Sequence, residues 1–246
     1  MLLRRTTWVA VAGLVTACTA APTVDDVVAR HLAARGGVER LAAVQSLRLT
    51  GRAIAGPAHQ ARVRREIQRP GGIRTEFTLQ GVTAVRACDG GACWQVAPLQ
   101  GLFDPEPMPP ETTRELLEQA DIDGPLVDWK GKGHRVSLVG RESVDGHEVF
   151  RLETTRADGT VRHDLIDAES HLLLRTEAKR LVRDRLRDTA ITFGDYREVE
   201  GLLFAHSIEV TAEGAPNRIQ VKVEKVELNP TLDETRFKMP ETPPNP

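Results

Sequence analysis

The stretch that decides the fold is SLVGRESVDGHEVFRLETTRADGTVRHDLIDAESHLLLRTE, residues Ser137 to Glu177. Turn signals divide it at intervals of roughly ten residues: Asp145-Gly146, Asp158-Gly159 and Asp167-Ala-Glu-Ser170. An Asp-Gly pair suits a tight hairpin, because the turn requires a positive φ that Gly and Asp accept at low cost. The segments between the turns are rich in Val, Leu, Ile, Phe and Thr, with a charge at every second or third place. The stretch therefore predicts a meander of about four strands, each with one face on a core and one on water.

More strands are predicted on both sides of this meander. They cover Ser46 to Ala55, His59 to Arg69, Ile73 to Leu79, Val82 to Ala87, the segment after Cys93, Lys179 to Phe193, Phe204 to Val210, and Arg218 to Leu228. A twisted antiparallel sheet of about ten or eleven strands tends to curl. We therefore expect a mainly β fold with a helical lid: one large curled antiparallel sheet, an unclosed β-barrel, covered by helices.

Two segments are predicted to be helical. Thr23 to Gln45 has an apolar stripe and an acidic first turn, and Gly36-Gly37 interrupts it. The Pro-rich stretch from Leu99 to Pro110 is expected to be a loop. Pro109-Pro110-Glu111 then opens a shorter helix that runs to Ala120. These helices either simply cover one end of the sheet or act as a movable lid over a cavity, and the two interpretations are compatible. The residues expected to face the sheet from the helices are Val28, Leu32, Leu41, Leu116 and Leu117.

The first 18 residues have the pattern of a signal peptide. Arg4 and Arg5 precede an apolar run that is too short to span a bilayer as a mature helix. Val15-Thr-Ala-Cys18 resembles a bacterial lipobox, in which Cys18 would be lipidated and would anchor the protein to a membrane. The alternative is ordinary cleavage near Thr19 to Ala21. We expect residues 19–240 to form one domain and residues 241–246 to form a disordered tail.

Cys88 and Cys93 flank a Gly-rich turn of a predicted hairpin. Cysteines in such positions can lie within the distance that a disulfide requires, and the compartment behind an export signal is oxidising. We expect a Cys88–Cys93 disulfide. A zinc site would need two further ligands nearby, and the spacing differs from the CxxC of thiol oxidoreductases. The basic residues Arg62, Arg64, Arg65 and Arg69 are read as a solvated face, with contact to lipid head groups as the minority interpretation.

The composition gives little support to several function classes. Net charge is −2 and no basic stripe is present, so nucleic-acid binding is disfavoured. Aromatic residues are 4% of the chain, too few to suggest stacking platforms for bases or sugars. No motif for a nucleophile elbow, a phosphate-binding loop, a dinucleotide site or a zinc protease is found. We therefore expect no enzyme activity, no catalytic residues, no metal and no cofactor.

A curled sheet with an aliphatic inner face would suit acyl chains, since each buried methylene contributes about 0.8 kcal/mol. A one-residue error in register would turn a chosen side chain to the other face. The residues expected to line the apolar trough are Leu49, Val63, Ile67, Phe77, Trp94, Phe150, Leu152, Leu174, Phe204 and Ile208.

Several segments resemble the bacterial LolA/LolB-like outer-membrane lipoprotein-sorting proteins. They are GGVERLAAVQSLRLTG (residues 36–51), CDGGACW (88–94), VGRESVDG (139–146), IDAESHL (166–172), FGDYREVEGLLF (193–204) and NPTLD (229–233) through Phe237. The resemblance covers nearly all of the mature chain. It implies an unclosed β-barrel with a helical lid, whose cavity carries lipid or lipoprotein acyl chains non-covalently.

The chain also departs from that family. The soluble carrier has no lipid anchor, so the lipobox-like segment is more similar to the membrane-anchored receptor. The lid-locking arginine of the carrier could correspond to Arg48 or to Arg52, and no motif chooses between them. We expect a protein exported to the periplasm and anchored to the outer membrane, where it binds acyl chains for transport or sorting and could contact other envelope proteins. The alternative is an envelope sensor or protein-interaction module on the same fold, with a hydrolase as a remote third.

Overall fold

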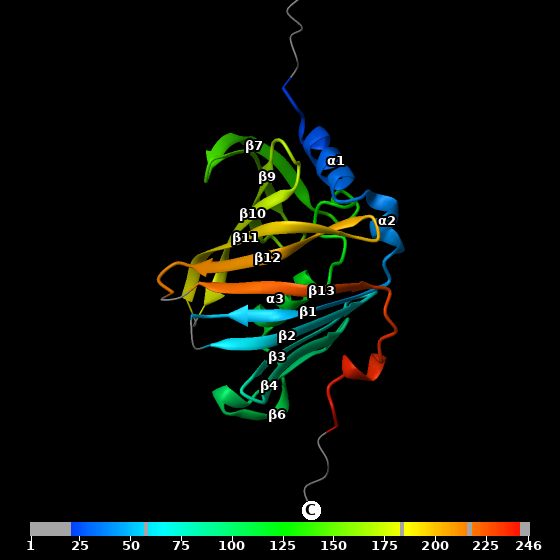
Figure 1. Cartoon of the computed structure of the whole chain (residues 1–246), viewed down its shortest axis with the longest axis vertical. Helices are drawn as coiled ribbons and strands as arrows, with labels where there is room; N and C mark the ends of the chain where they lie inside the picture. Colours follow the sequence, from blue (N-terminus) through cyan, green and yellow to red (C-terminus); the bar gives the residue numbers. More distant parts are fainter. Residues whose placement is uncertain (1–20, 57–58, 183–184, 216–217, 242–246) are drawn as a thin grey trace, which may run out of the picture.

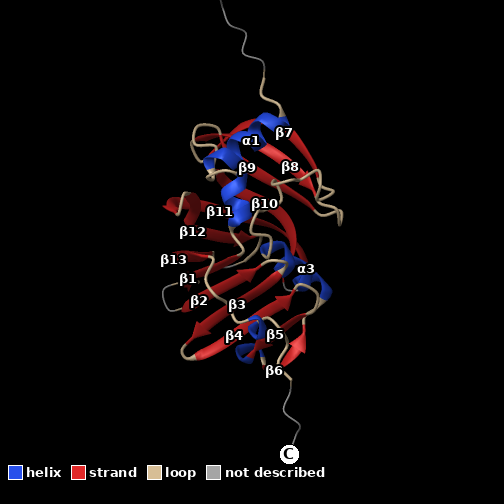
Figure 2. Cartoon of the chain, turned by 90° about the vertical axis from the view of Figure 1, so that its right-hand side faces the viewer, coloured by secondary structure: helices blue, strands red, loops and turns tan. Residues whose placement is uncertain are grey.

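The computed structural model describes residues 21–56, 59–182, 185–215 and 218–241, so Cys18 and residues 242–246 of the expected tail lie outside the described part. One antiparallel sheet of 13 strands forms the body of the protein (Figure 1). The sheet is strongly curved, and its two halves enclose helix α3 on the inner side (Figure 2). The prediction of a mainly β fold with a curled, unclosed sheet and few helices is confirmed.

The first half of the sheet is a meander of six strands. They are β1 (Ser46–Ile54), β2 (Gln60–Gln68), β3 (Gly72–Leu79), β4 (Val82–Asp89), β5 (Cys93–Ala97) and β6 (Leu102–Pro107). The second half is a meander of seven strands. They are β7 (Arg135–Val144), β8 (His147–Thr155), β9 (Val161–Asp167), β10 (Leu173–Val182), β11 (Arg185–Val199), β12 (Leu202–Ala212) and β13 (Ile219–Leu228). The short 3-10 helices η1 (Pro98–Gln100) and η2 (Glu234–Arg236) lie in the connections.

The two halves join where β1 pairs with β13, the first strand with the last. Leu47 lies opposite Leu228, and the register shifts between Thr50 and Gly51. The two edges of the sheet are β6 and β7, which are consecutive in the chain but do not pair with each other. The segment between them carries α3 (Pro110–Gln119), so a helical connection spans the inner side at the place where a closed barrel would have a strand ladder (Figure 2).

The four-strand meander predicted for 137–177 is confirmed as β7 to β10. Two other predictions were wrong. The single strand expected at 179–193 is in fact the end of β10 and the start of β11, and β11 then continues to Val199. The Pro-rich stretch after Leu99 was expected to be a loop but contains β6, which tolerates proline because it is an edge strand. The described residues form 13 strands, above the expected ten or eleven, and β6 is the one that no predicted segment covers.

The N-terminal helices α1 (Val24–Ala34) and α2 (Val38–Ala43) form as the sequence predicts. The Asp26 amide donates to Thr23 Oγ1 at 3.2 Å and the Thr23 amide donates to Asp26 Oδ2 at 2.9 Å, which completes a capping box. Gly36 separates the helices with φ +114°, and a Cβ there would lie 2.2 Å from the carbonyl oxygen of Gly201. Only glycine permits this close approach of the interhelical turn to the sheet.

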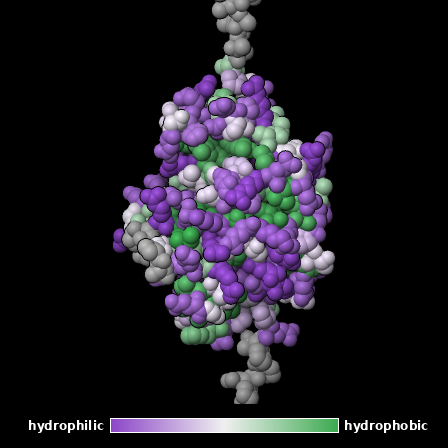
Figure 3. Space-filling model, in the orientation of Figure 1, coloured by the Kyte–Doolittle hydropathy of each residue, from purple (hydrophilic) through white to green (hydrophobic). Residues whose placement is uncertain are grey.

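The hydrophobic core lies between the inner face of the sheet and the helices. The predicted lid residues Val28, Leu32, Leu41 and Leu116 are all buried in this core, and Leu117 packs against it. The outer face carries a charged network centred on Glu66, which is 1% exposed and accepts hydrogen bonds from Arg48, Arg64 and Arg236. Figure 3 views the molecule from the side away from α3, and polar residues dominate that surface.

Candidate functional site

A mostly apolar cavity lies on the inner face of the sheet, beneath α3. It has a volume of about 410 Å³, within the range of about 300–1,000 Å³ that is usual for small-molecule pockets. Larger hollows of about 670 Å³ lie on the outer face, but many of their lining side chains are charged. An apolar ligand would leave those charges without water or a partner, so we regard the cavity beneath α3 as the candidate site.

The central strands provide the apolar wall of the cavity. Four of the residues predicted to line a trough do so: Leu49 of β1, Val63 of β2, Phe77 of β3 and Ile208 of β12. Sequence reasoning missed five further apolar residues, although they alternate along strands in the same way: Ile191, Phe193, Val210, Val221 and Val223. The wall therefore runs without interruption across the junction of β1 and β13.

The remaining predicted trough residues lie elsewhere. Ile67, Phe150 and Leu152 are buried in the packed core, and Phe204 packs against it. Leu174 belongs to neither the core nor the cavity, because the pairing of β10 with β9 shifts between Leu173 and Arg175. The irregularity turns Leu173 into the core instead.

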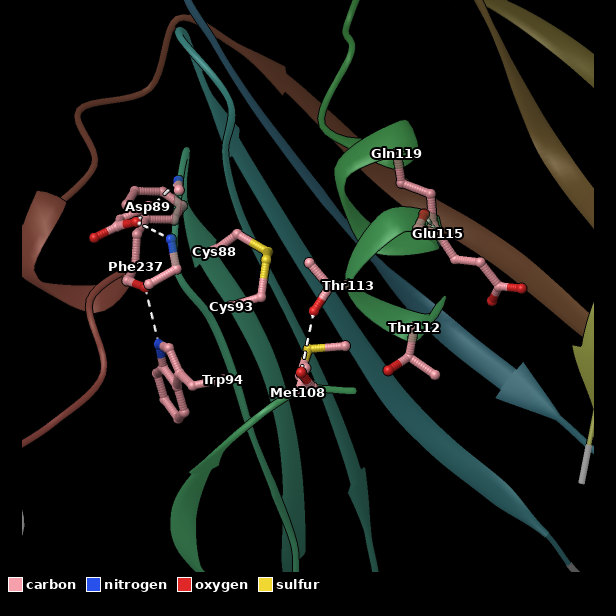
Figure 4. Close-up of a disulfide and its surroundings, with 12 residues drawn as sticks. Cys88, Asp89, Cys93, Trp94, Met108, Thr112, Thr113, Glu115, Gln119 and Phe237 are labelled. Atoms are coloured by element: carbon pink, nitrogen blue, oxygen red, sulfur yellow. Dashed lines mark hydrogen bonds between the residues drawn. A yellow bond between two sulfur atoms is a disulfide. The ribbon is translucent and has the colours of Figure 1, made fainter. Parts of the chain in front are cut away.

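Trp94 is placed on the opposite face of the sheet from the cavity. It packs with Val85 and Ala87, and its Nε1 donates to the carbonyl oxygen of Phe237 at 2.9 Å. Figure 4 shows Trp94 directed to the C-terminal segment and away from α3. The alternation of side chains along β5 explains this placement, since the preceding Cys93 faces inward.

The predicted disulfide is confirmed. Cys88 and Cys93 are bonded with a Cα–Cα distance of 4.1 Å, and both are buried in the core. The hydroxyl of Thr113 on α3 donates to the carbonyl oxygen of Met108 at 3.3 Å, beside this disulfide (Figure 4). The disulfide therefore fixes the turn against which the start of α3 is packed.

Ion pairs connect α3 to the second half of the sheet. Glu118 pairs with Arg180 of β10 at 3.2 Å and with Arg156 at 3.0 Å, and Arg114 pairs with Asp158 at 3.5 Å. Burial is the main cause that raises the pKa of the neighbouring Glu115, which also lines the cavity. Leu116 of α3 is also buried in the core, so α3 is held by apolar packing together with these ion pairs.

Helix α1 has a different role from α3. Neither Val28 and Leu32 of α1 nor Leu41 of α2 lines the cavity, and all three are packed in the core. His31 of α1 is 4% exposed and its Nδ1 donates to the carbonyl oxygen of His171 at 2.9 Å. Helix α1 thus packs over one end of the sheet, and α3 is the helix that covers the cavity.

The basic cluster predicted on β2 is divided between the two faces. Arg64 points outward to Glu66, whereas Arg65 lines the cavity. Arg69 leaves the strand to form a bidentate pair with Asp123, with nitrogen to oxygen distances of 2.8 and 2.6 Å. The expected single solvated face is therefore wrong, because consecutive strand residues alternate.

Neither a metal site nor a membrane-spanning helix is found in the described part of the chain. Within it, no three or more His, Cys, Asp or Glu side chains are grouped in a way that could hold a metal ion. The helices of the same part include none that is long and apolar enough to cross a membrane.

No protein-family model matches the chain, and no curated protein matches it in sequence. Solved structures do match. A DUF1329 family protein from Desulfovibrio piger aligns at a TM-score of 0.59 and 12% identity, covering 89% of this chain and 98% of the other. A LolA superfamily protein from Nitrosomonas europaea aligns at 0.57 and 14%, with coverages of 89% and 98%.

A further match is a structure named for an outer membrane lipoprotein-sorting protein domain from Vibrio parahaemolyticus. It has a TM-score of 0.54 and 16% identity, and the alignment covers 85% of this chain and 94% of that domain. Identities this low establish likeness of fold alone. The chain therefore has the unclosed-sheet fold of the LolA superfamily and of outer-membrane lipoprotein-sorting domains.

Proposed function

We propose that the cavity beneath α3 binds the acyl chains of lipids or lipoproteins without catalysis, for transport or sorting at the bacterial outer membrane. The observation that carries the proposal is a continuous aliphatic and aromatic wall in a cavity that α3 covers. Each methylene transferred from water to this wall would contribute about 0.8 kcal/mol. The likeness in fold to a lipoprotein-sorting domain supports the same function.

Binding of an acyl-chain fluorophore tests the proposal, together with lipid extraction and native mass spectrometry of the protein purified from membranes. Val221→Trp would fill the cavity from β13 and is expected to abolish fluorophore binding. The matched control is Lys222→Trp, because Lys222 is the next residue of the same strand and is exposed on the opposite face. Absence of co-purifying lipid together with absence of fluorophore binding would refute the proposal.

The site of action in this proposal is the periplasmic side of the outer membrane, reached by export and held by a lipid on Cys18. Cys18→Ala is expected to move the protein from the membrane fraction to the soluble fraction. If the variant fractionates as the wild type does, the lipobox interpretation is wrong and another interaction holds the protein at the membrane.

The second candidate function is a protein-interaction module of the cell envelope. The observation that favours it is two exposed apolar residues at the sheet edge: Leu99 just before edge strand β6, 65% exposed, and Phe103 within β6, 72% exposed. Exposed apolar side chains at a free sheet edge favour pairing with another chain. Replacing both residues with Ser would then abolish complex formation in the envelope and leave fluorophore binding unchanged.

A further inference from the structure

Arg65 is placed on the cavity wall among apolar side chains. It lies between Val63 and Ile67 on the inner face of β2, and it lines the cavity beneath α3. Its Nε donates to Thr75 Oγ1 at 3.2 Å, and Thr75 is itself 3% exposed. With the residues that the structure describes, Arg65 forms no ion pair. Its charge is therefore held in a mostly apolar cavity by one neutral hydroxyl.

The other two arginines of the cavity are neutralised. Arg162 forms a close ion pair with Asp164, and Arg180 pairs with Glu118 of α3. The contrast matters because a buried charge without a counter-charge is costly, whereas a paired one costs much less. Burial lowers the pKa of Arg65 to about 10, so the side chain is still a cation at neutral pH.

The position of Arg65 along β2 sets the direction in which a ligand would lie. Beyond it, Ile67 and Ile73 are packed in the core, so the cavity ends near the guanidinium. On the other side, Val63, Phe77 and Val221 extend the apolar wall. A ligand with its charged end at Arg65 would thus place its chain along that wall.

We propose that the cavity binds an amphiphile with an anionic head group, a carboxylate or a phosphate, which Arg65 holds through its guanidinium. This inference rests on the proposed function and specifies its ligand class. A guanidinium presents parallel N–H donors that match two oxygens of either group, which a lysine ammonium would not do. The Thr176 hydroxyl, which also lines the cavity, already donates to Asp164 Oδ1 at 2.8 Å, so Arg65 is the donor that is left for the head group.

A competing explanation is that Arg65 is neutralised by the protein itself. Glu115 lines the same cavity, and its present partner Arg180 is 3.8 Å away, a loose contact. A movement of α3 could bring the Glu115 carboxylate to Arg65 in place of a ligand. Glu115→Gln separates the two explanations, since removing an internal competitor would strengthen binding of an anion and leave binding of a neutral chain unchanged.

The test compares three ligands of one chain length, namely palmitate, hexadecyl phosphate and neutral hexadecanol, each displacing an acyl-chain fluorophore from the full chain. The wild type is expected to bind the anions on the order of 10- to 100-fold more tightly than hexadecanol, the range for a charged hydrogen bond. Arg65→Gln should remove this preference and leave hexadecanol binding unchanged. Arg62→Gln is the matched control, because Arg62 is an exposed residue of the same strand.

A preference that persists in Arg65→Gln, or its absence in the wild type, would overturn the inference. If hexadecanol and the anions bind equally, the proposed acyl-chain function stands and the anion site does not exist. If no ligand displaces the fluorophore and none binds directly, the acyl-chain function and the anion site are both refuted. The ratio of the two anion affinities identifies carboxylate or phosphate as the preferred head group.

A second measurement uses only the wild-type protein, in case the variant does not fold. Palmitate labelled with ¹³C at its carboxyl group is titrated while bound, and its chemical shift reports ionisation. A guanidinium contact favours the carboxylate form, so the pKa of the bound carboxyl should fall below that of a carboxyl in water. A raised pKa would show that the head group lies in an apolar place away from Arg65 and would overturn the inference.

Discussion

Replacement of His31 should change how the stability of the protein depends on pH. Burial beneath α1 is the main cause that lowers the pKa of His31 from its ordinary 6.5 to about 4. The neutral ring donates from Nδ1 to the carbonyl oxygen of His171, and Arg35 and Arg162 nearby also disfavour the protonated form. The unfolded chain therefore takes up a proton at a higher pH than the folded chain does.

The difference between the pKa of His31 in the folded and in the unfolded chain sets the sign and the size of the change in stability with pH. The contribution of neutral His31 is present above pH 6.5 and is lost as the pH falls toward 4. Between pH 7 and pH 5 the linkage relation gives a loss of about 2 kcal/mol in the free energy of unfolding. His31→Gln keeps an amide donor and has no proton to gain, so this loss should disappear in the variant.

The assay is urea unfolding of the two proteins at pH 7, 6 and 5, with the difference between them as the readout. Other groups titrate in both proteins and cancel in that difference. Arg30→Gln serves as the control, because Arg30 is exposed on the same helix. Parallel stability curves for the wild type and His31→Gln would refute the reasoning.

Three further predictions concern the packing around the site. Phe237→Ala should cost about 3–5 kcal/mol of stability, since Phe237 is 3% exposed, and should shift Trp94 fluorescence to the red; an unshifted spectrum would mean that the C-terminal segment does not cover the indole. Replacing Cys88 and Cys93 by Ser should lower the free energy of unfolding by about 2 kcal/mol in urea, as the short closed loop implies, and an unchanged midpoint would contradict this. Arg180→Gln should accelerate hydrogen exchange in α3 while the amides of β2 keep their protection; equal rates in α3 of wild type and variant would show that its ion pairs do not hold the helix.

Most of the fold could be predicted from the sequence, because the same turn signals recur between short alternating segments. Asp145 and the glycine after it turn the chain between β7 and β8, and Asp145 has φ +52°, as the Asp-Gly pair requires. The boundary between β10 and β11 was missed because the sequence between Val182 and Arg185 contains no Gly, Pro or Asn. Strand β6 was missed because the four prolines between Leu99 and Glu111 indicate a loop unless the strand is known to be an edge.

The sequence predicted less of the candidate site than of the fold. Alternation correctly assigned Val63 to the inner face, and the same parity would have placed Arg65 beside it. Arg65 was not assigned to the inner face from the sequence, because four nearby arginines are most simply interpreted as a solvated patch. Leu174 could not be assigned, because the irregularity of β10 depends on its pairing with β9 and not on its own residues.

The pairing of β1 with β13 constrains the order in which the protein can be completed. The partner of Leu47 is Leu228, so the first strand made has no neighbour on one side until nearly the whole chain exists. Non-local pairings of this kind slow folding, and an unpaired strand edge in the meantime is a surface on which other chains aggregate. A chaperone that shields the β1 edge would thus protect the folding chain more effectively than one that acts on any hairpin, since the hairpins can close as soon as they are made.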